Sequence, residues 1–272
     1  MLGAVIGDIV GSIYEWNNIK TKNFVLFEDG CHFTDETVVT FAVANGLMRW
    51  RYEEGSLKQY LTEEMQRLGR LYPKAGYAGM FQRWLMKKNP EPYRSRGNGA
   101  AMRVAPIAYG ATSLEETEEL AKLCAEITHN HSEGIKGAIA VAGCIYLSIN
   151  GADKKDIKAY AEKFYSIDFT LDEIRPHYSY NSSAEGSIPY AIAAFLEGSS
   201  FEDCLRNAIS IGGDSDTIAS IACAMAEGYY GIPEILKRRA MVYLKGTEFL
   251  GDYKSFMMIF REDREKKRLQ GQ

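Results

Sequence analysis

The hydrophobic pattern has a helical period along almost the whole chain, and this period constrains the fold more than any other feature. Apolar residues recur three and four positions apart, as they do in helices with one buried face. The predicted helices are 2–16, 34–50, 56–70, 76–88, 100–110, 114–127, 133–149, 154–165, 187–198, 201–211, 215–230 and 233–243. FVLF at 24–27 reads as a strand, but one short strand cannot build a sheet. The sequence therefore predicts an all-α fold.

Two predicted helices are apolar on nearly all sides. They are 34–50 (TDETVVTFAVANGLMRW) and 215–230 (SDTIASIACAMAEGYY). A helix of this kind is stable in water when other helices surround it. Others, such as 56–70, carry charge on one face and apolar residues on the other. We therefore expect 34–50 and 215–230 at the centre of the molecule.

Length and composition are typical of one globular domain. The chain has 272 residues and is 46% hydrophobic, which suits a single domain over 1–272 with residues 261–272 as a solvated tail. Its net charge of −4 comes from interspersed acids and bases, so we expect no binding to a nucleic-acid backbone.

Cysteines and apolar runs indicate the compartment. The chain has five cysteines, an odd number without any CxxC pair, and this argues against a disulfide framework or a zinc cage. The apolar start lacks a basic leader region and is interrupted by Asp8. No run reaches the ~18 apolar residues of a membrane span. We expect a cytoplasmic protein that does not bind membranes, with a monomer as the default.

Acidic residues begin both of the apolar helices. FTDETVVT places Asp35 and Glu36 in a first turn, and GGDSDTIAS places Asp214 and Asp216 at another. Carboxylates are common at helix starts, because they cap free N–H groups and complement the helix dipole. Each segment by itself fits this capping role.

Taken together, the two segments predict a metal centre. Four carboxylates brought out of water repel one another, which raises their pKa or recruits cations. Their charge matches two divalent ions, and the hydroxyls of Thr34 and Thr217 add neutral ligands. A set of hard oxygen atoms suits Mg²⁺ or Mn²⁺ rather than zinc or copper.

Five blocks of the chain carry a resemblance to a known family. They are GDIVGSIYE (7–15), FTDETVVT (33–40), GNGAAMRVAPIA (97–108), THNHSEGIKGA (128–138) and the long block 186–231. In this order they resemble the ADP-ribosylglycohydrolase family. The resemblance implies an orthogonal all-α multi-helix bundle with a binuclear magnesium or manganese centre. It also implies hydrolysis of a glycosidic bond between ADP-ribose and an acceptor, on a protein or on a small conjugate.

The resemblance also implies roles for the acidic residues and their neighbours. The implied metal ligands are Thr34, Asp35, Glu36, Asp214, Asp216 and Thr217. The family has aspartate where this chain has Glu36, and the extra methylene extends the carboxylate by about 1.5 Å. The metal at this position therefore shifts, its coordination changes, or the ligand is lost.

The segment GSIYE supplies a further acid. On a helix, Glu15 shares a face with Asp8 and Ser12, while glycines at four-residue spacing leave another face bare (Gly3, Gly7, Gly11). The glycines fit close helix packing, and Glu15 fits either a surface acid or, by the resemblance, a group beside the metals. We predict Glu15 and Asp35 as the catalytic carboxylates, one acting on the leaving group and one on the attacking water, with their roles open.

Other polar segments are candidates for binding the substrate. Gly97, Asn98 and Gly99 precede a predicted helix, where backbone N–H groups could cradle a phosphate. His129 borders the cleft by the resemblance. Residues 175–187 form a polar aromatic loop whose tyrosines, Tyr178 and Tyr180, either stack on adenine or pack the loop.

Two other functions remain open at this point. The fold could be kept for structure or for binding ADP-ribose without catalysis, as in crystallin-like relatives, and Glu36 favours this alternative. The chain could also act on another ADP-ribose conjugate, such as an acylated ADP-ribose or a modified base. The intact acids favour an enzyme, because a scaffold gains nothing from such a cluster.

Overall fold

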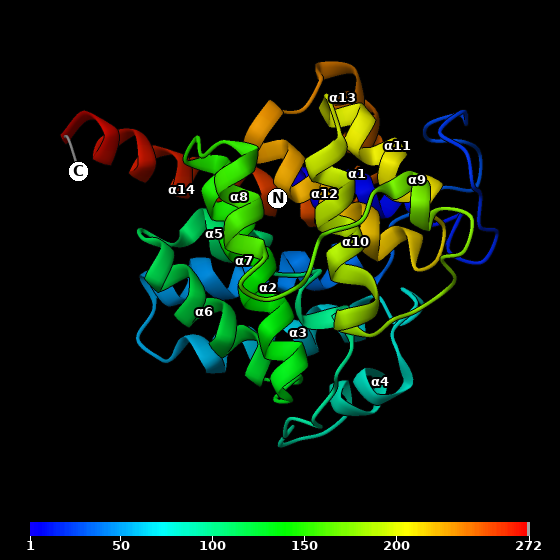
Figure 1. Ribbon diagram of the computed structural model, residues 1–272. Coiled ribbons are helices and arrows are strands. Elements are labelled where there is room, and N and C mark those ends of the chain that lie inside the picture. Colours follow the sequence, from blue (N-terminus) through cyan, green and yellow to red (C-terminus); the bar gives the residue numbers. More distant parts are fainter. Residues whose placement is uncertain (271–272) are drawn as a thin grey trace.

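The computed structural model describes the backbone of residues 1–270 and the side chains of residues 1–260. Helices dominate, and residues 1–270 contain no strand. The helices are α1 (Leu2–Gly11), α2 (Asp35–Tyr52), α3 (Leu57–Leu71), α4 (Gly79–Leu85), the 3₁₀ helix η1 (Asn98–Ala100), α5 (Ala105–Gly110), α6 (Leu114–Glu126), α7 (Ser132–Ile149), α8 (Lys154–Ala161), α9 (Leu171–Ile174), α10 (Ala184–Glu197), α11 (Phe201–Ser210), α12 (Ser215–Tyr230), α13 (Glu234–Tyr243) and α14 (Phe249–Gln270) (Figure 1). The predicted all-α class is confirmed.

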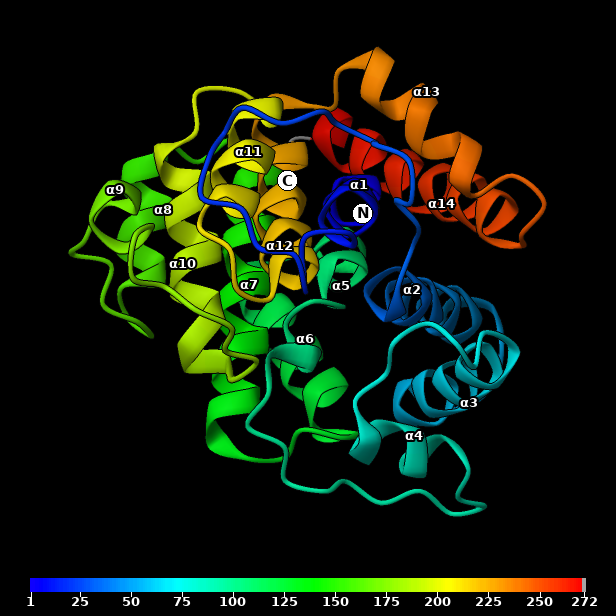
Figure 2. The ribbon, with the colours of Figure 1, turned by 90° about the vertical axis from the view of Figure 1, so that its right-hand side faces the viewer.

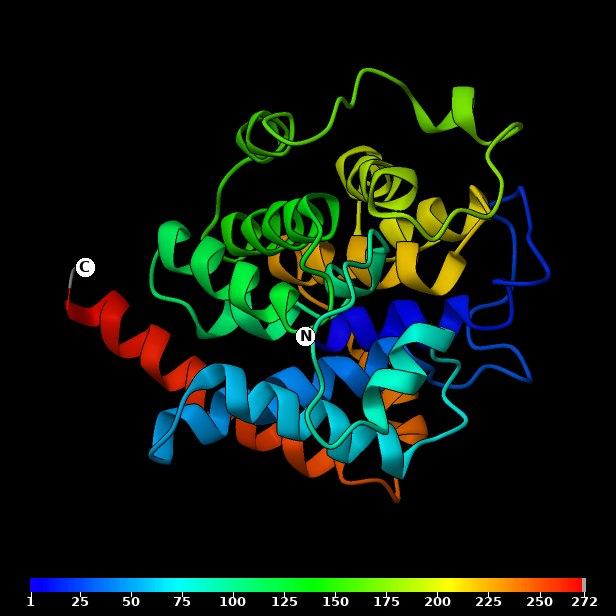
Figure 3. The same ribbon diagram turned by 90° about the horizontal axis from the view of Figure 1, so that it is seen from below.

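The first helix lies at the centre of the bundle. Figure 3 shows α1 between a layer that contains α2 and α3 and a layer that contains α7 and α10. Helix α12 packs along α1 and also contacts α7, α10 and α11. All residues of α12 from Ser215 to Ala226 are buried, as are those of α2 from Glu36 to Leu47. The central positions predicted for these two apolar helices are therefore correct.

Some predicted boundaries were wrong for local reasons. Residues 24–27 are not a strand, because they have no partner segment and Phe27 has a left-handed φ of 54°. The predicted helix 100–110 is divided into η1 and α5, since Pro106 lacks an N–H and favours the start of a new helix. The first helix ends at Gly11 rather than at residue 16, and turns follow it.

The chain after residue 245 contains a helix that the hydrophobic period did not predict. Helix α14 buries Phe249, Phe256 and Phe260, whose spacing places them on one face. Its backbone continues to Gln270, through much of the segment predicted as a solvated tail. The side chains of 261–272 lie outside the described residues, so solvation of that segment stays a prediction.

Helix α7 meets the length and composition of a membrane span, with 56% of its window buried inside the molecule. It packs against α5, α6, α10 and α12. Core helices commonly have the same composition, so α7 is weak evidence for a membrane segment.

Candidate metal centre

A cavity of about 700 Å³ opens where α2 and α12 begin. Its walls come from segments that are distant in the sequence, and Thr34 and Asp216, 182 positions apart, approach to 3.5 Å between side-chain oxygens. Every predicted site residue lines this cavity: Glu15, Thr34, Asp35, Glu36, Gly97, Asn98, Gly99, His129, Asp214, Asp216 and Thr217. The two acidic helix starts therefore converge on one space.

Three glycines allow α1 to lie directly on α12. A Cβ atom added at Gly7 would lie 2.3 Å from the backbone of Ala219, and one added at Gly11 would lie 2.6 Å from the Cα of Asp216. Gly3 makes an equally close approach at the start of α1. Since only glycine permits such backbone contact, the predicted close packing is confirmed. Figure 2 shows the two helices side by side.

The start of α2 is capped from outside the helix. The buried carboxylate of Asp8 accepts hydrogen bonds from the backbone N–H groups of Thr34 (2.9 Å) and Thr37 (3.1 Å) and from both of their hydroxyls. Thr34 occupies the N-cap position, but its own side chain does not cap the helix. Asp8 therefore performs the structural role that the sequence assigned to acids of the helix itself. The side chains of Asp35 and Glu36 are left to face the cavity.

The start of α12 is also unusual. Asp214 is the N-cap residue, yet its side chain makes no capping hydrogen bond within the described residues. Its carboxylate instead accepts a hydrogen bond from the Asn98 amide at 2.7 Å, and the same amide nitrogen lies 3.0 Å from the Ser187 hydroxyl. Gly212 and Gly213 precede it with φ values of 71° and 79°, which favour glycine. This turn directs Asp214 into the cavity.

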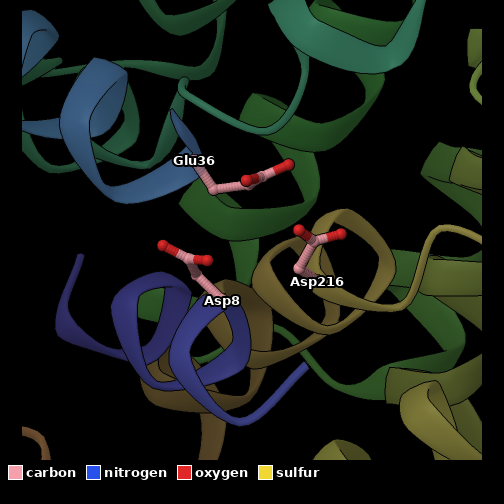
Figure 4. A group of neighbouring side chains, drawn as sticks. All are labelled: Asp8, Glu36 and Asp216. Atoms are coloured by element: carbon pink, nitrogen blue, oxygen red, sulfur yellow. The ribbon is translucent and has the colours of Figure 1, made fainter. Parts of the chain in front are cut away.

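The acids form two groups that share one member. Asp8, Glu36 and Asp216 make one group, and Glu15, Asp214 and Asp216 make the other. Within each group, one oxygen from each residue lies within 4.8 Å of the others. In Figure 4 the carboxylates of the first group extend into one space from α1, α2 and α12. A carboxylate common to both groups is the arrangement expected when two cations lie side by side.

Glu36 spans the space between the two helix starts. One of its oxygens accepts a hydrogen bond from the Thr217 hydroxyl at 2.5 Å, and the other lies within hydrogen-bond distance of the Thr34 hydroxyl. The Thr34 hydroxyl also lies 2.6 Å from Asp8. The longer side chain thus reaches α12 and stays inside the acidic cluster. Its extra methylene does not carry the Glu36 carboxylate away from the other candidate ligands.

Burial and mutual repulsion raise the pKa of the clustered carboxyls. Burial, followed by the charge of Asp214, raises the pKa of Glu15 to about 7. Burial and the charge of Asp8 raise the pKa of Asp35 to about 8. Burial is also the largest cause for Glu36 and Asp216, whose pKa values lie well above the ordinary range.

The composition of this cluster fits divalent cations. Neither the five carboxylates of the two groups nor the neighbouring Asp35 form an ion pair with a lysine or arginine in the part of the chain that the structure describes. All the ligand atoms on offer are hard oxygens. Uncompensated buried carboxylates are costly in free energy, and bound Mg²⁺ or Mn²⁺ would remove that cost.

Asp8 is the residue that the site prediction omitted. A buried acid in the otherwise apolar segment 2–11 was the available signal. The predicted shared helical face of Asp8 and Glu15 was wrong in its geometry, because α1 ends at Gly11 and a turn carries Glu15 to the cavity. The tertiary fold brings the two residues to the same cluster nevertheless.

The glycine loop before η1 makes contacts that its sequence did not reveal. The Gly97 N–H donates to the Ser95 hydroxyl at 3.1 Å, and the Asn98 N–H donates to the Ser182 carbonyl at 2.9 Å. Both N–H groups are therefore engaged and cannot cradle a phosphate in this arrangement. At Gly99, an added Cβ would lie 3.3 Å from the ring of His129, so the glycine makes room for that ring.

His129 is buried beside a buried arginine. Arg103 donates to the Thr128 hydroxyl at 2.9 Å, and that hydroxyl lies 2.7 Å from Nδ1 of His129. Burial and the positive charge of Arg103 hold the pKa of His129 well below its usual range, so the ring is neutral. Arg103 has no carboxylate partner among the described residues, and this end of the cavity therefore favours an anion.

Comparisons with known proteins agree with this geometry. The family model of ADP-ribosylglycohydrolase matches residues 1–251. The chain is 26% identical over 313 residues to "ADP-ribosylhydrolase ARH3" of Mus musculus, covering 86% of this chain and 84% of the relative. It is 23% identical over 269 residues to "ADP-ribosylarginine hydrolase Tri1" of Pseudomonas putida, covering 85% and 70%.

A solved structure described as an "ADP-ribosylglycohydrolase-related protein complex" has the same fold. It aligns with a TM-score of 0.66 and 22% identity over 89% of this chain and 93% of that one. The family match, the all-α fold and the order of the sequence blocks lead to one conclusion. The chain belongs to the ADP-ribosylglycohydrolase family.

Proposed function

We propose that this protein hydrolyses the glycosidic bond between ADP-ribose and an acceptor group, with two divalent cations in the acidic cluster. The convergence of two helix starts on shared carboxylates is the observation that carries the proposal. The clustered carboxylates lack lysine or arginine partners among the described residues, which leaves their charge available to cations. The relatives named for ADP-ribosyl hydrolysis support the substrate class.

We propose that the cations are Mg²⁺ or Mn²⁺ and that Glu36, Asp214, Asp216, Thr34 and Thr217 hold them. Asp8 caps α2 and orients Thr34, while Asn98 orients Asp214. Such bound ions supply Lewis-acid activation of water and of the ribose hydroxyls. The remaining chemistry belongs to the side chains of the protein.

Two carboxyl groups are available for proton transfer. In the proposed reaction the bond between C1 of the distal ribose and the acceptor breaks, and its electron pair leaves with the acceptor. A water oxygen bonds to C1 and gives a proton to Asp35, whose carboxylate the positive charge of bound cations would keep ionised, while Glu15 gives its proton to the acceptor atom that leaves with the electron pair. Burial, followed by the charge of Asp214, raises the pKa of Glu15, and a carboxyl group with a raised pKa suits a general acid.

The part of the cavity wall that contains Arg103 and His129 suits the anionic part of the substrate. The buried guanidinium of Arg103 raises the electrostatic potential there, and neutral His129 lies beside it at the glycine loop. We propose that the diphosphate of ADP-ribose lies near these two residues. The distal ribose then lies over the acidic cluster. The free state of all five cysteines agrees with a cytoplasmic location.

Release of ADP-ribose from defined conjugates tests this proposal. The protein is incubated with Mg²⁺ or Mn²⁺ and a panel of ADP-ribosyl-arginine, ADP-ribosyl-serine and O-acetyl-ADP-ribose. We expect release from at least one conjugate, abolished by chelation and restored by metal. Tight ADP-ribose binding without release from any conjugate would favour the alternative of a non-catalytic binding protein.

A further inference from the structure

Two large aromatic side chains stack on each other at the mouth of the cavity. The rings of Trp16 and Tyr180 lie 5.2 Å apart between centroids, with 21° between their planes. Both residues line the cavity, yet Trp16 is 74% exposed and Tyr180 is 45% exposed. Exposed tryptophan rings are enriched at binding sites, where they present a flat face at low entropic cost.

The stacked pair is held on the same frame as the acidic cluster. Asn18 exchanges two hydrogen bonds with the backbone of Gly213, at 2.7 and 3.0 Å. Lys20 donates to the carbonyl oxygens of Tyr178 (2.6 Å) and Ile211 (2.5 Å). These contacts tie together the turn after α1, the loop before α10 and the loop before α12. Asn18 is two residues from Trp16 and Tyr178 is two residues from Tyr180, so these contacts restrain the backbone segments that carry the pair.

The charges around the pair are acidic. After burial, the causes that raise the pKa of Tyr180 are the charges of Asp214, Glu15 and Asp216 in turn. Glu15 is also the residue that precedes Trp16. Glu15 is not among the residues proposed to hold the cations, so its carboxyl group stays beside the aromatic pair at the cavity wall. The electron-rich ring faces and the neighbouring carboxylate favour a cation at this surface.

The geometry points to Trp16 and Tyr180 as an acceptor subsite that binds the guanidinium of an ADP-ribosylated arginine. This inference rests on the proposed hydrolase function and names its substrate class. A guanidinium is planar, delocalised and always charged, so it stacks on aromatic faces and is attracted by carboxylates. A serine acceptor has no such face, and a stacked ring pair offers it no comparable contact.

The location of the pair favours the acceptor over the adenine. Trp16 and Tyr180 adjoin Glu15 and the acids that flank the reacting carbon. In ADP-ribose, the adenine is separated from that carbon by two riboses and a diphosphate. An acceptor bonded to the carbon lies next to it. The pair is therefore in reach of the leaving group, and the adenine belongs farther from the acidic cluster.

Removing the tryptophan face tests the subsite. We compare the wild type with Trp16→Ala and Trp16→Phe, and use Trp50→Ala as a control, since Trp50 is 40% exposed on α2 and does not line the cavity. For an ADP-ribosyl-arginine peptide, Trp16→Ala should lower kcat/KM about tenfold, mainly through KM, and Trp16→Phe should restore most of it. Hydrolysis of an ADP-ribosyl-serine peptide and the Kd for free ADP-ribose should change less than about twofold.

A second probe isolates the acceptor side. Nα-acetyl-arginine amide should inhibit the wild type competitively and Trp16→Ala much more weakly, while Nα-acetyl-serine amide inhibits neither. An equal loss of activity on both peptides, or weaker ADP-ribose binding by Trp16→Ala, would overturn the assignment and place the pair at the adenine. Hydrolysis of the serine peptide with inactivity on the arginine peptide would also overturn it. Inactivity on every conjugate would instead count against the proposed function.

Discussion

Two neighbouring helices, α11 and α12, begin with acidic residues that serve opposite purposes. At α11, the Ser200 hydroxyl accepts from the Asp203 N–H at 3.1 Å. The Asp203 carboxylate accepts from Ser199 at 2.9 Å and pairs with Lys22, and its pKa is lowered despite burial. At α12, the Asp216 carboxylate has no cationic partner among the described residues, and burial and like charges raise its pKa well above normal.

The difference shows how to separate structural acids from functional ones. At α11 the carboxylate stabilises the helix that contains it. At α12 and α2 the acids destabilise the metal-free fold, and at α2 the capping is done by Asp8 from another helix. An acid whose capping role is filled by another residue is free for chemistry. The predictions below test this contrast.

The largest effect is expected from neutralising Asp216. We expect Asp216→Asn to abolish uptake of at least one metal and to lower turnover at least about 100-fold, because its carboxylate belongs to both acidic groups. Calorimetric titration with Mn²⁺ and the ADP-ribose release assay measure the two effects. Glu115→Gln is the control, since Glu115 lies in the first turn of α6 and faces solvent. If Asp216→Asn retained normal metal uptake, the contrast between the helix starts would be lost.

A smaller effect is expected from the residue that orients Asp214. Asn98→Ala removes the amide that donates to Asp214 at 2.7 Å, without removing any carboxylate. We expect the weaker of the two Mn²⁺ affinities to fall about 10- to 100-fold. Electron paramagnetic resonance can follow this titration at both sites. Unchanged affinity would mean that Asp214 needs no orienting partner or does not hold a metal.

The sequence predicted the fold class and which acidic residues meet, but not the contacts that hold those acids in place. The helical period predicted the all-α class, and the two acidic motifs predicted which residues would meet. The role of Asp8 could not be predicted, because capping of α2 from α1 depends on how the two helices cross. The sequence pattern assigned Asn98 to a loop that binds substrate. Its hydrogen bond to Asp214 joins segments more than one hundred residues apart, so the local sequence could not predict it.

Close packing of α1 on α12 brings the acids together. Gly7 lies at this contact, so a substitution there tests whether the packing is needed for stability and metal binding. A Cβ at Gly7 would meet the backbone of Ala219 at 2.3 Å, so Gly7→Ala must push the helices apart. We expect it to lower the free energy of unfolding by about 1–3 kcal/mol or more and to weaken metal binding. Gly251→Ala, in α14, meets nothing within 4 Å and should raise stability by about 0.5–1 kcal/mol. Urea unfolding measures both variants, and equal effects would contradict the packing argument.

The smallest predicted effect is on the pH dependence of stability. Asp35 and Glu15 have folded-state pKa values of about 8 and about 7, above those of an unfolded chain. Between about pH 4 and 8 the folded protein therefore binds more protons than the unfolded chain does. These two groups contribute most to the free energy of unfolding at low pH, and that contribution is lost as pH rises through this range.

The thermal midpoint of the chelated protein should consequently be lower at about pH 8 than at about pH 5.5. Saturating Mn²⁺ should remove or reverse this trend, because bound cations favour the ionised carboxylates. Scanning calorimetry in four conditions, with and without metal at each pH, measures the effect. A chelated protein that gains stability toward pH 8 would show that the cluster is not held protonated in the metal-free fold.

Anomalous diffraction from crystals soaked in Mn²⁺ tests the central claim most directly, because it locates each ion without reference to activity. The account predicts two peaks about 3.5–4 Å apart between the starts of α2 and α12, with Asp216 reaching both. Peaks confined to surface acids, or no peak near Asp216, would contradict it.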